Sequence, residues 1–194
     1  MMANQAEIRN EGELRMWLEQ LHPSSCGWAL SCCSGDADMA NDAVQSAYLK
    51  ILQGRARYGG RASFKSWLFS VIRITVMDEK RRRWWRRLRL VKWESEAQVQ
   101  APVRGEHLDE SARLGAFREA LALLPARQRE VLHLVFYQDL SVQEASKIMG
   151  VSLGTARTHY ERGKRALRSH LEKTEHFYDY GQQRERFEIA VWRT

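Results

Sequence analysis

Apolar residues recur every three or four positions along most of the chain, which is the spacing of amphipathic helices. Such stripes predict helices at residues 11–21, around 28–30, at 36–52, after Ser63, at 114–124, after Pro125, at 142–149 and from 153 to 171. Alternating runs and Asn-Gly or Asp-Gly turns, which are typical of strands and hairpins, are nearly absent. The predicted fold class is therefore all-α.

The stretch from 141 to 171 has the most specific pattern. Ser141 and Glu144 have the spacing of a capping box, and Gly150 follows a short apolar stripe at the place where a helix would end. Ser152 can then cap a second, longer helix with a basic outer face. Two helices joined by a tight turn that contains Gly predict a helix-turn-helix. The alternative is an ordinary helical hairpin with a solvated basic face.

Charge is distributed unevenly along the chain. The net charge is +7, and eight of the thirteen residues from Lys80 to Lys92 are basic, with Trp84 and Trp85 among them. Basic side chains neutralise phosphates, and exposed aromatic rings offer faces on which bases stack. Nuclear localisation or a membrane surface would need the same charges, but we interpret this run as binding nucleic acid.

A change of composition divides the chain into two domains. Residues 93–112 are acidic and have no sustained apolar period, which indicates a linker. We therefore expect a first helical domain at 1–92, the linker at 93–112, and a second domain with the helix-turn-helix at 113–173. A C-terminal extension at 174–194 has no assigned role.

Several classes of protein are not favoured. The polar N-terminus has no signal-peptide core and no apolar run could span a bilayer, so we expect a cytoplasmic protein without a membrane partner. Cys26, Cys32 and Cys33 match no common zinc spacing, so structural thiols are favoured over a metal or redox site. We predict no metal, no cofactor and no catalytic residue.

Three blocks follow one another in a fixed order along the chain. The first is the helix from Asp42 to Tyr48, and the second runs from Phe64 to Arg83. The third begins at Leu124-Pro125 and continues through the helix-turn-helix to Thr158. As a set, these blocks resemble the extracytoplasmic-function (ECF) group of sigma factors in the sigma-70 family, which are initiation subunits of bacterial RNA polymerase. Members usually have Asn where this chain has Ile74, a small Ala where it has Gly163, and a neutral or basic residue where it has Glu161.

The resemblance implies two DNA-reading surfaces. The helix after Ser152 would lie in the major groove of the minus-thirty-five element, with Arg157 and Thr158 at base edges. Its expected contact residues are Thr155, Arg157, Thr158, Arg162, Lys164, Arg165 and Arg168. The loop at 55–63, with Phe64, would receive an unstacked minus-ten base. The expected contact residues for the minus-ten element and the DNA upstream of it are Arg61, Phe64, Lys65, Trp67, Arg73, Lys80, Arg81, Arg82, Arg83, Arg86 and Arg87.

The resemblance also implies partners. These are promoter DNA, core RNA polymerase through its β′ clamp and β flap, and an anti-sigma factor that restrains the chain. The docking face on the polymerase would consist of Asp38, Asn41, Asp42, Gln45 and Tyr48. The acidic linker would thread the RNA exit path, and the polymerase would supply the chemistry.

Three other functions compete with this one. A stand-alone helix-turn-helix regulator would need the same second domain but not the polymerase-docking helix. An enzyme would need clustered carboxylates beside His at metal spacing, which the chain lacks. An interaction protein that has kept the fold without promoter activity is the third.

Overall fold

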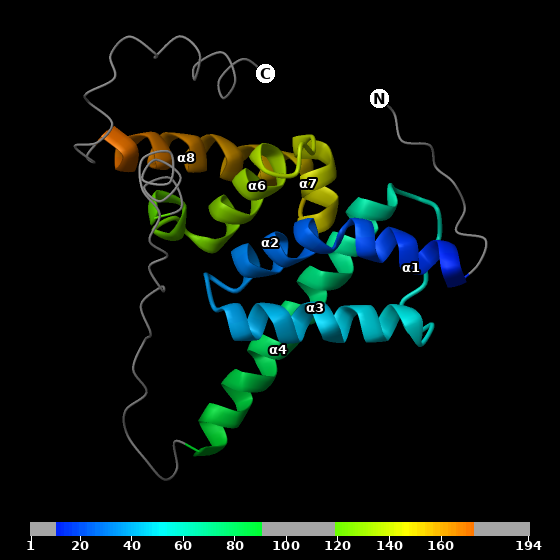
Figure 1. The fold of residues 1–194 in the computed structure, drawn as a ribbon. Coiled ribbons are helices and arrows are strands. Elements are labelled where there is room, and N and C mark those ends of the chain that lie inside the picture. The colour runs from blue at the N-terminus through cyan, green and yellow to red at the C-terminus, as the bar shows by residue number, and fades with distance from the viewer. Residues whose placement is uncertain (1–10, 91–118, 173–194) are drawn as a thin grey trace, which may run out of the picture.

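The computed structural model describes residues 11–90 and 119–172 (Figure 1). Every regular element in these two ranges is a helix, which confirms the all-α prediction. The helices are α1 (Glu11–Gln20), α2 (His22–Cys32), α3 (Ala37–Leu52), α4 (Phe64–Leu90), α6 (Ala126–Phe136), α7 (Val142–Met149) and α8 (Leu153–Glu172). A helical turn at 119–122 precedes α6. The predicted linker and C-terminal extension lie outside the described residues.

The first domain, residues 11–90, packs α2 and α3 against the first half of α4. Leu68, Phe69 and Ile72 of α4 are fully buried there. Trp28 of α2 is also buried, stacks on the Phe69 ring at 6.0 Å between centroids, and donates from Nε1 to the Phe69 carbonyl at 3.0 Å. Trp28 therefore ties α2 to α4 through both its ring and its polar atom.

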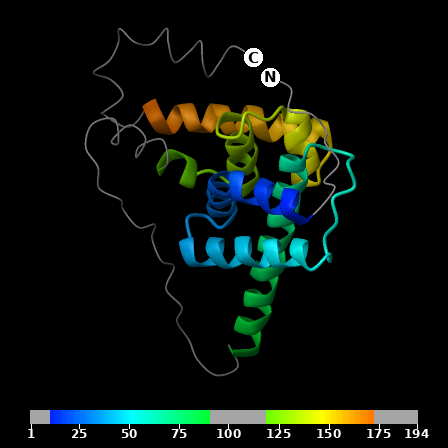
Figure 2. The same cartoon turned by 45° about the vertical axis from the view of Figure 1, so that its right-hand side comes forward.

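The second half of α4 extends past the other helices, away from α8, in both views (Figures 1 and 2). Trp84 and Trp85 lie in this part of the helix and are 55% and 52% exposed. Their ring centroids are 4.8 Å apart in an edge-to-face arrangement. The predicted basic, aromatic segment is thus a helical projection.

The second domain, residues 119–172, is a helix-turn-helix, α7 and α8, packed on α6. The capping box predicted at its start is present: the Glu144 amide donates to Ser141 Oγ at 3.2 Å, and the Ser141 amide donates to Glu144 Oε2 at 2.9 Å. Gly150 ends α7 with a φ of 64°, the left-handed conformation that Gly adopts at little cost. The predicted helix-turn-helix is therefore confirmed.

Gly163 allows α8 to approach α6 closely. A Cβ atom at this position would lie 3.1 Å from Leu132 Cδ1 and 3.2 Å from Gln128 Cβ. The resembled family usually has Ala at this position. Gly163 therefore differs from the family at a point where two helices are in tight contact.

The two domains also pack on each other, which the sequence did not predict. α2 contacts α6, and α4 contacts α7. The buried apolar residues of both domains form one continuous cluster, from Leu18 to Leu167. The domains are therefore joined through a shared core as well as through the chain between them.

The cysteines are free thiols, and two of them belong to the core. Cys32 and Cys33 are buried, and burial raises the pKa of both, to about 11 for Cys33. Cys26 is half-buried, with its Sγ 3.6 Å from His22 Nε2. Within 11–90 and 119–172, no group of three or more His, Cys, Asp or Glu side chains could hold a metal ion. None of the helices in these ranges is long and apolar enough to cross a membrane.

Candidate nucleic-acid interface

The outer face of α8 is the first part of the candidate interface. The inner face of this helix buries Ala156, Tyr160, Gly163 and Leu167 at helical spacing. The opposite face therefore projects from the domain. Exposed on it are Thr155, Arg157, Thr158, Arg162, Arg165 and Arg168.

Hydroxyl groups order the first turns of α8. The Thr155 amide donates to Ser152 Oγ at 3.1 Å, and the hydroxyls of Ser152 and Thr155 are 2.8 Å apart. Thr158 Oγ1 donates to the Gly154 carbonyl at 3.0 Å. The Thr158 hydroxyl proton is therefore used within the helix, and its oxygen lone pairs remain to accept a hydrogen bond.

Two of the predicted basic residues on α8 have acidic neighbours on the same helix. Lys164 is half-buried, with its Nζ 3.6 Å from Glu161 Oε1 and 4.8 Å from the centroid of the Tyr160 ring. Arg168 Nε is 3.1 Å from Glu172 Oε1. Because an exposed pair such as Arg168–Glu172 contributes little, a phosphate group can compete for Arg168.

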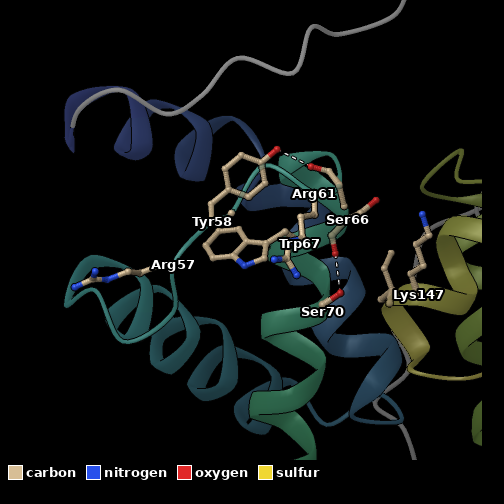
Figure 3. Close-up of a pocket in the computed structure, with 10 residues that line it drawn as sticks. Arg57, Tyr58, Arg61, Ser66, Trp67, Ser70 and Lys147 are labelled. Atoms are coloured by element: carbon tan, nitrogen blue, oxygen red, sulfur yellow. Dashed lines mark hydrogen bonds between the residues drawn. The ribbon is translucent and has the colours of Figure 1, made fainter.

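A cavity of about 430 Å³ forms the second part of the candidate interface (Figure 3). The loop between α3 and α4 contributes Tyr58 and Arg61, and α4 contributes Trp67. Its other lining residues are Arg57, Gly59, Ala62, Ser66, Ser70, Lys147 and Ile148. The two aromatic rings lie together in the close-up, with centroids 5.4 Å apart. Cationic and aromatic groups thus surround a space large enough for a base.

Internal hydrogen bonds hold this loop on α4. The Tyr58 hydroxyl donates to the Ala62 carbonyl, and the Ser66 amide donates to Ser63 Oγ at 3.2 Å, so Ser63 caps the start of α4. Arg57 Nε donates to the Gly54 carbonyl at 3.2 Å. The loop therefore has a defined shape rather than depending on a ligand for it.

Three of the predicted minus-ten residues are not on an open surface in this structure. Phe64 is 8% exposed and packs among the rings of Trp17, Tyr58 and Trp67. Arg73 is 7% exposed. Lys65 donates from Nζ to the carbonyl of Gln138, in the second domain, at 2.8 Å. Arg61, in contrast, is exposed, and Trp67 is half-buried at the edge of the cavity.

The projecting part of α4 carries the densest positive charge. Arg81, Arg82, Arg86 and Arg87 are exposed there. Some of its cations already have partners: Arg81 pairs with Asp78 at 3.3 Å and Arg86 with Glu79 at 2.9 Å. Lys80 donates to the Cys32 carbonyl at 2.7 Å.

The predicted docking residues lie on one exposed face of α3. Asp38, Asn41, Asp42 and Gln45 are all exposed, and Asp36 caps the helix by accepting from the Met39 amide at 2.9 Å. Tyr48 is half-buried, and its hydroxyl donates to the Leu18 carbonyl at 3.2 Å.

One arginine connects this face to α4. Arg83 of α4 lies 3.5 Å from Asp36 and 3.9 Å from Asp42 of α3, and 3.7 Å from Glu79 of its own helix. The docking face and the basic helix are therefore adjacent.

Sequence reasoning missed several lining residues of the cavity. Tyr58 lies within the predicted loop at 55–63 but was not among the expected contact residues, although its aromatic ring in a basic loop is a detectable signal. Lys147 and Ile148 were not, because they come from α7, and no local pattern indicates that the second domain packs there.

Known protein families match the chain in the same two domains. The family model for sigma-70 region 2 matches residues 17–86, and the model for sigma-70 region 4 matches residues 114–167. The ECF RNA polymerase sigma factor SigX of Bacillus subtilis is 30% identical over 146 residues, which cover 71% of this chain and 73% of that protein. The ECF RNA polymerase sigma factor EcfG of Rhodopseudomonas palustris is 30% identical over 149 residues, 75% of this chain and 77% of that protein.

A solved structure is similar over most of the chain. The sigma factor RpoE, in complex with the anti-sigma factor NepR from Bartonella quintana, matches with a TM-score of 0.66 at 25% identity. The match covers 83% of this chain and 98% of that one.

Proposed function

The chain belongs to the ECF group of the sigma-70 family, which binds core RNA polymerase and directs promoter-specific initiation, and we propose that its two domains divide promoter recognition between them. The observation that carries this proposal is the pairing of an exposed, Arg-rich helix-turn-helix with a basic, aromatic surface on a separate domain. A stand-alone regulator would use the first of these surfaces without the second.

The second domain reads the minus-thirty-five element. α8 enters the major groove with its N-terminal turns first, so Arg157 and Thr158 meet base edges. A guanidinium donates two hydrogen bonds to guanine, and a threonine hydroxyl oxygen can accept from an exocyclic amino group. Arg162, Arg165 and Arg168 lie further along the exposed face and position the helix on phosphates.

The first domain holds the minus-ten element of the non-template strand. An unstacked base enters the cavity between the α3–α4 loop and α4, where Tyr58 and Trp67 offer ring faces and Arg61 a cation. Unstacking costs a few kcal/mol, which stacking and pocket contacts offset. Phe64 packs against the rings of both Tyr58 and Trp67 and so helps to hold them in place.

The projecting half of α4 follows the duplex just upstream. Its exposed arginines contact phosphates without reading bases, and Trp84 and Trp85 add apolar surface at the point where strands separate. The exposed acidic face of α3 docks on the β′ clamp. No step of bond making or breaking is assigned to this chain, because the polymerase carries the reaction.

An anti-sigma factor is a further proposed partner. The RpoE structure described above was solved with one, and the match to this chain spans both domains. The extension after residue 173 is a second candidate for control.

In vitro transcription with purified core enzyme tests the proposed function. The expected result is new start sites that depend on the chain, preceded by related minus-thirty-five and minus-ten sequences. Co-purification with core enzyme at low and moderate salt is the companion measurement. If the chain failed to associate with core at either salt concentration, the proposal would be wrong and only a DNA-binding regulator would remain.

A further inference from the structure

The first helix of the chain reaches the minus-ten cavity through aromatic side chains. Trp17 of α1 is not among the residues that line the cavity, but its ring centroid is 6.1 Å from that of Phe64. Phe64 is buried, and its ring centroid lies 5.5 Å from that of Tyr58 and 5.2 Å from that of Trp67. Trp17 is therefore one ring removed from the two aromatic walls of the cavity.

The orientation of the two wall rings decides whether a base can stack on them. The Tyr58 ring meets Phe64 edge-on, with 87° between the ring planes, and it meets Trp67 at 55°. A base stacks on the face of a ring, so a ring that is free to rotate loses part of this contact. Packing behind a binding side chain locks its rotamer. Phe64 supplies this packing directly, and Trp17 packs in turn against Phe64.

α1 is itself fixed at the residue that follows Trp17. Leu18 is buried, and its carbonyl accepts a hydrogen bond from the Tyr48 hydroxyl of α3 at 3.2 Å. The Tyr48 ring also lies edge-on to that of His22, at the start of α2, with 5.9 Å between centroids. Tyr48, which the sequence predicted as a docking residue, therefore anchors α1 within the first domain.

We infer that Trp17 is a positioning residue for the minus-ten base: through Phe64, it holds the Tyr58 and Trp67 rings in the orientation that stacking requires. The base itself does not touch Trp17. This inference rests on the proposed function, because it needs a base to enter the cavity.

The competing role for Trp17 is that of a core residue that adds only stability. Trp17 is half-buried and packs at the edge of the buried cluster. Loss of a purely stabilising residue lowers the free energy of unfolding and does not change the response of the protein to any one base of the promoter. Loss of a positioning residue removes the response to the captured base, and a double-mutant cycle between protein and DNA measures this coupling.

Four variants of the full chain, all with the same net charge, separate the two roles. Trp17→Leu and Trp17→Met keep an apolar side chain but remove the ring. Trp17→Phe keeps a ring that can pack on Phe64, so it is the conservative variant that should restore function. Met16→Ala is the control, because Met16 precedes Trp17 on the same helix and is 56% exposed.

Open-complex formation by the polymerase holoenzyme provides the readout. The promoter is one found by start-site mapping, and an abasic site replaces each minus-ten nucleotide of the non-template strand in turn. With wild type, the abasic site at the captured position should lower open-complex formation by about tenfold, because stacking on protein rings contributes on this order.

The ring-less variants should have lost most of this effect in advance. With Trp17→Leu and Trp17→Met, open-complex formation on the intact promoter should fall by about fivefold, and the same abasic site should then lower it less than about twofold further. Trp17→Phe and Met16→Ala should form open complexes about as well as wild type and keep the full abasic effect. Binding of every variant to core polymerase should equal that of wild type, since the exposed face of α3 is unchanged.

Three results would overturn the inference. If the abasic effect in both ring-less variants were as large as in wild type, Trp17 would be a stabilising residue only. If both variants failed to bind core polymerase, the ring would serve the fold of the domain rather than the cavity. If no abasic position affected wild type, the proposed base site itself would be wrong, and this inference would fall with it.

Discussion

Arg157 and Arg87 are chemically identical side chains to which the structure gives different surroundings. Arg157 is exposed on the first turns of α8, beside Thr158, whereas Arg87 is exposed on the projecting half of α4. In the proposed function, Arg157 meets base edges, whereas Arg87 contacts only the phosphates of the duplex. Residue identity alone therefore does not decide whether an arginine contributes to specificity.

Replacement of Arg157 by Ala should change promoter choice. Loss of a bidentate contact costs about 1–3 kcal/mol at promoters that carry the matching base and much less at others. Run-off transcription on a panel of promoters with single-base changes in the minus-thirty-five element measures this. The matched variant is Arg87→Ala, which should weaken every promoter by one common factor and reduce the salt dependence of binding. A common factor for both variants would contradict the division of roles.

The fold alters the titration of His133, which lies in α6 beside Trp28 and Tyr137. Burial lowers its pKa from 6.5 to about 4, with a smaller contribution from the positive charge of Lys65. The unfolded chain therefore binds a proton at His133 between these pH values, while the folded chain does not. The folded state loses stability as pH falls through this window, because stability rises with pH wherever the unfolded state holds more protons.

We expect the free energy of unfolding of wild type to fall by roughly 2–3 kcal/mol more than that of His133→Phe between pH 7 and pH 4.5. Phe keeps a ring between Trp28 and Tyr137, so packing is largely preserved. Urea unfolding at several pH values gives both curves, and carboxylate titration cancels in their difference. Parallel curves would mean that His133 does not titrate in this range.

At the scale of elements, short-range sequence signals determine where most of the helices begin and end. Ser141, Glu144 and Gly150 set the limits of α7 through capping and a positive φ, and Asp36 and Ser63 lie at the starts of α3 and α4. Capping signals of this kind act over a few residues, so they can be recognised in the sequence.

Only part of the candidate site could be predicted from the sequence. The exposed face of α8 follows from its apolar stripe, and the exposure of Trp84 and Trp85 follows from a segment too basic to be buried. Burial of Arg73, in contrast, requires Glu130, which is distant in the chain, and the cavity requires Lys147 from the other domain. Contacts of this kind have no local signature.

Gly150 provides a test of the turn. With a φ of 64°, Gly150→Ala should destabilise the chain by about 1 kcal/mol, although a Cβ atom there would meet nothing within 4 Å. The control is Gly154→Ala, inside α8, where Ala has the better helix propensity and stability should be equal or higher. Thermal unfolding of both variants measures the difference. A stable Gly150→Ala variant would contradict the left-handed turn.

At the scale of the whole molecule, the two domains share one buried cluster. Residues from Leu18 to Leu167 contribute to it, so neither domain covers its apolar surface fully without the other. Cooperative unfolding is the physical consequence of such a shared core.

We therefore expect the wild-type chain to unfold in one transition, with a ratio of calorimetric to van 't Hoff enthalpy close to one. Scanning calorimetry in the absence of DNA and polymerase measures this ratio. Two resolved transitions would mean that each domain is stable by itself.

The position of Arg83 has a consequence for the order of assembly. Its guanidinium is shared by Asp36 and Asp42 on one helix and Glu79 on its own. A clamp that takes Asp42 as its own ligand leaves this cation with fewer anions nearby, and hence readier for a phosphate. Binding to polymerase would then raise the affinity of this surface for nucleic acid. The complex with polymerase, rather than the free chain, would be the species that binds promoters.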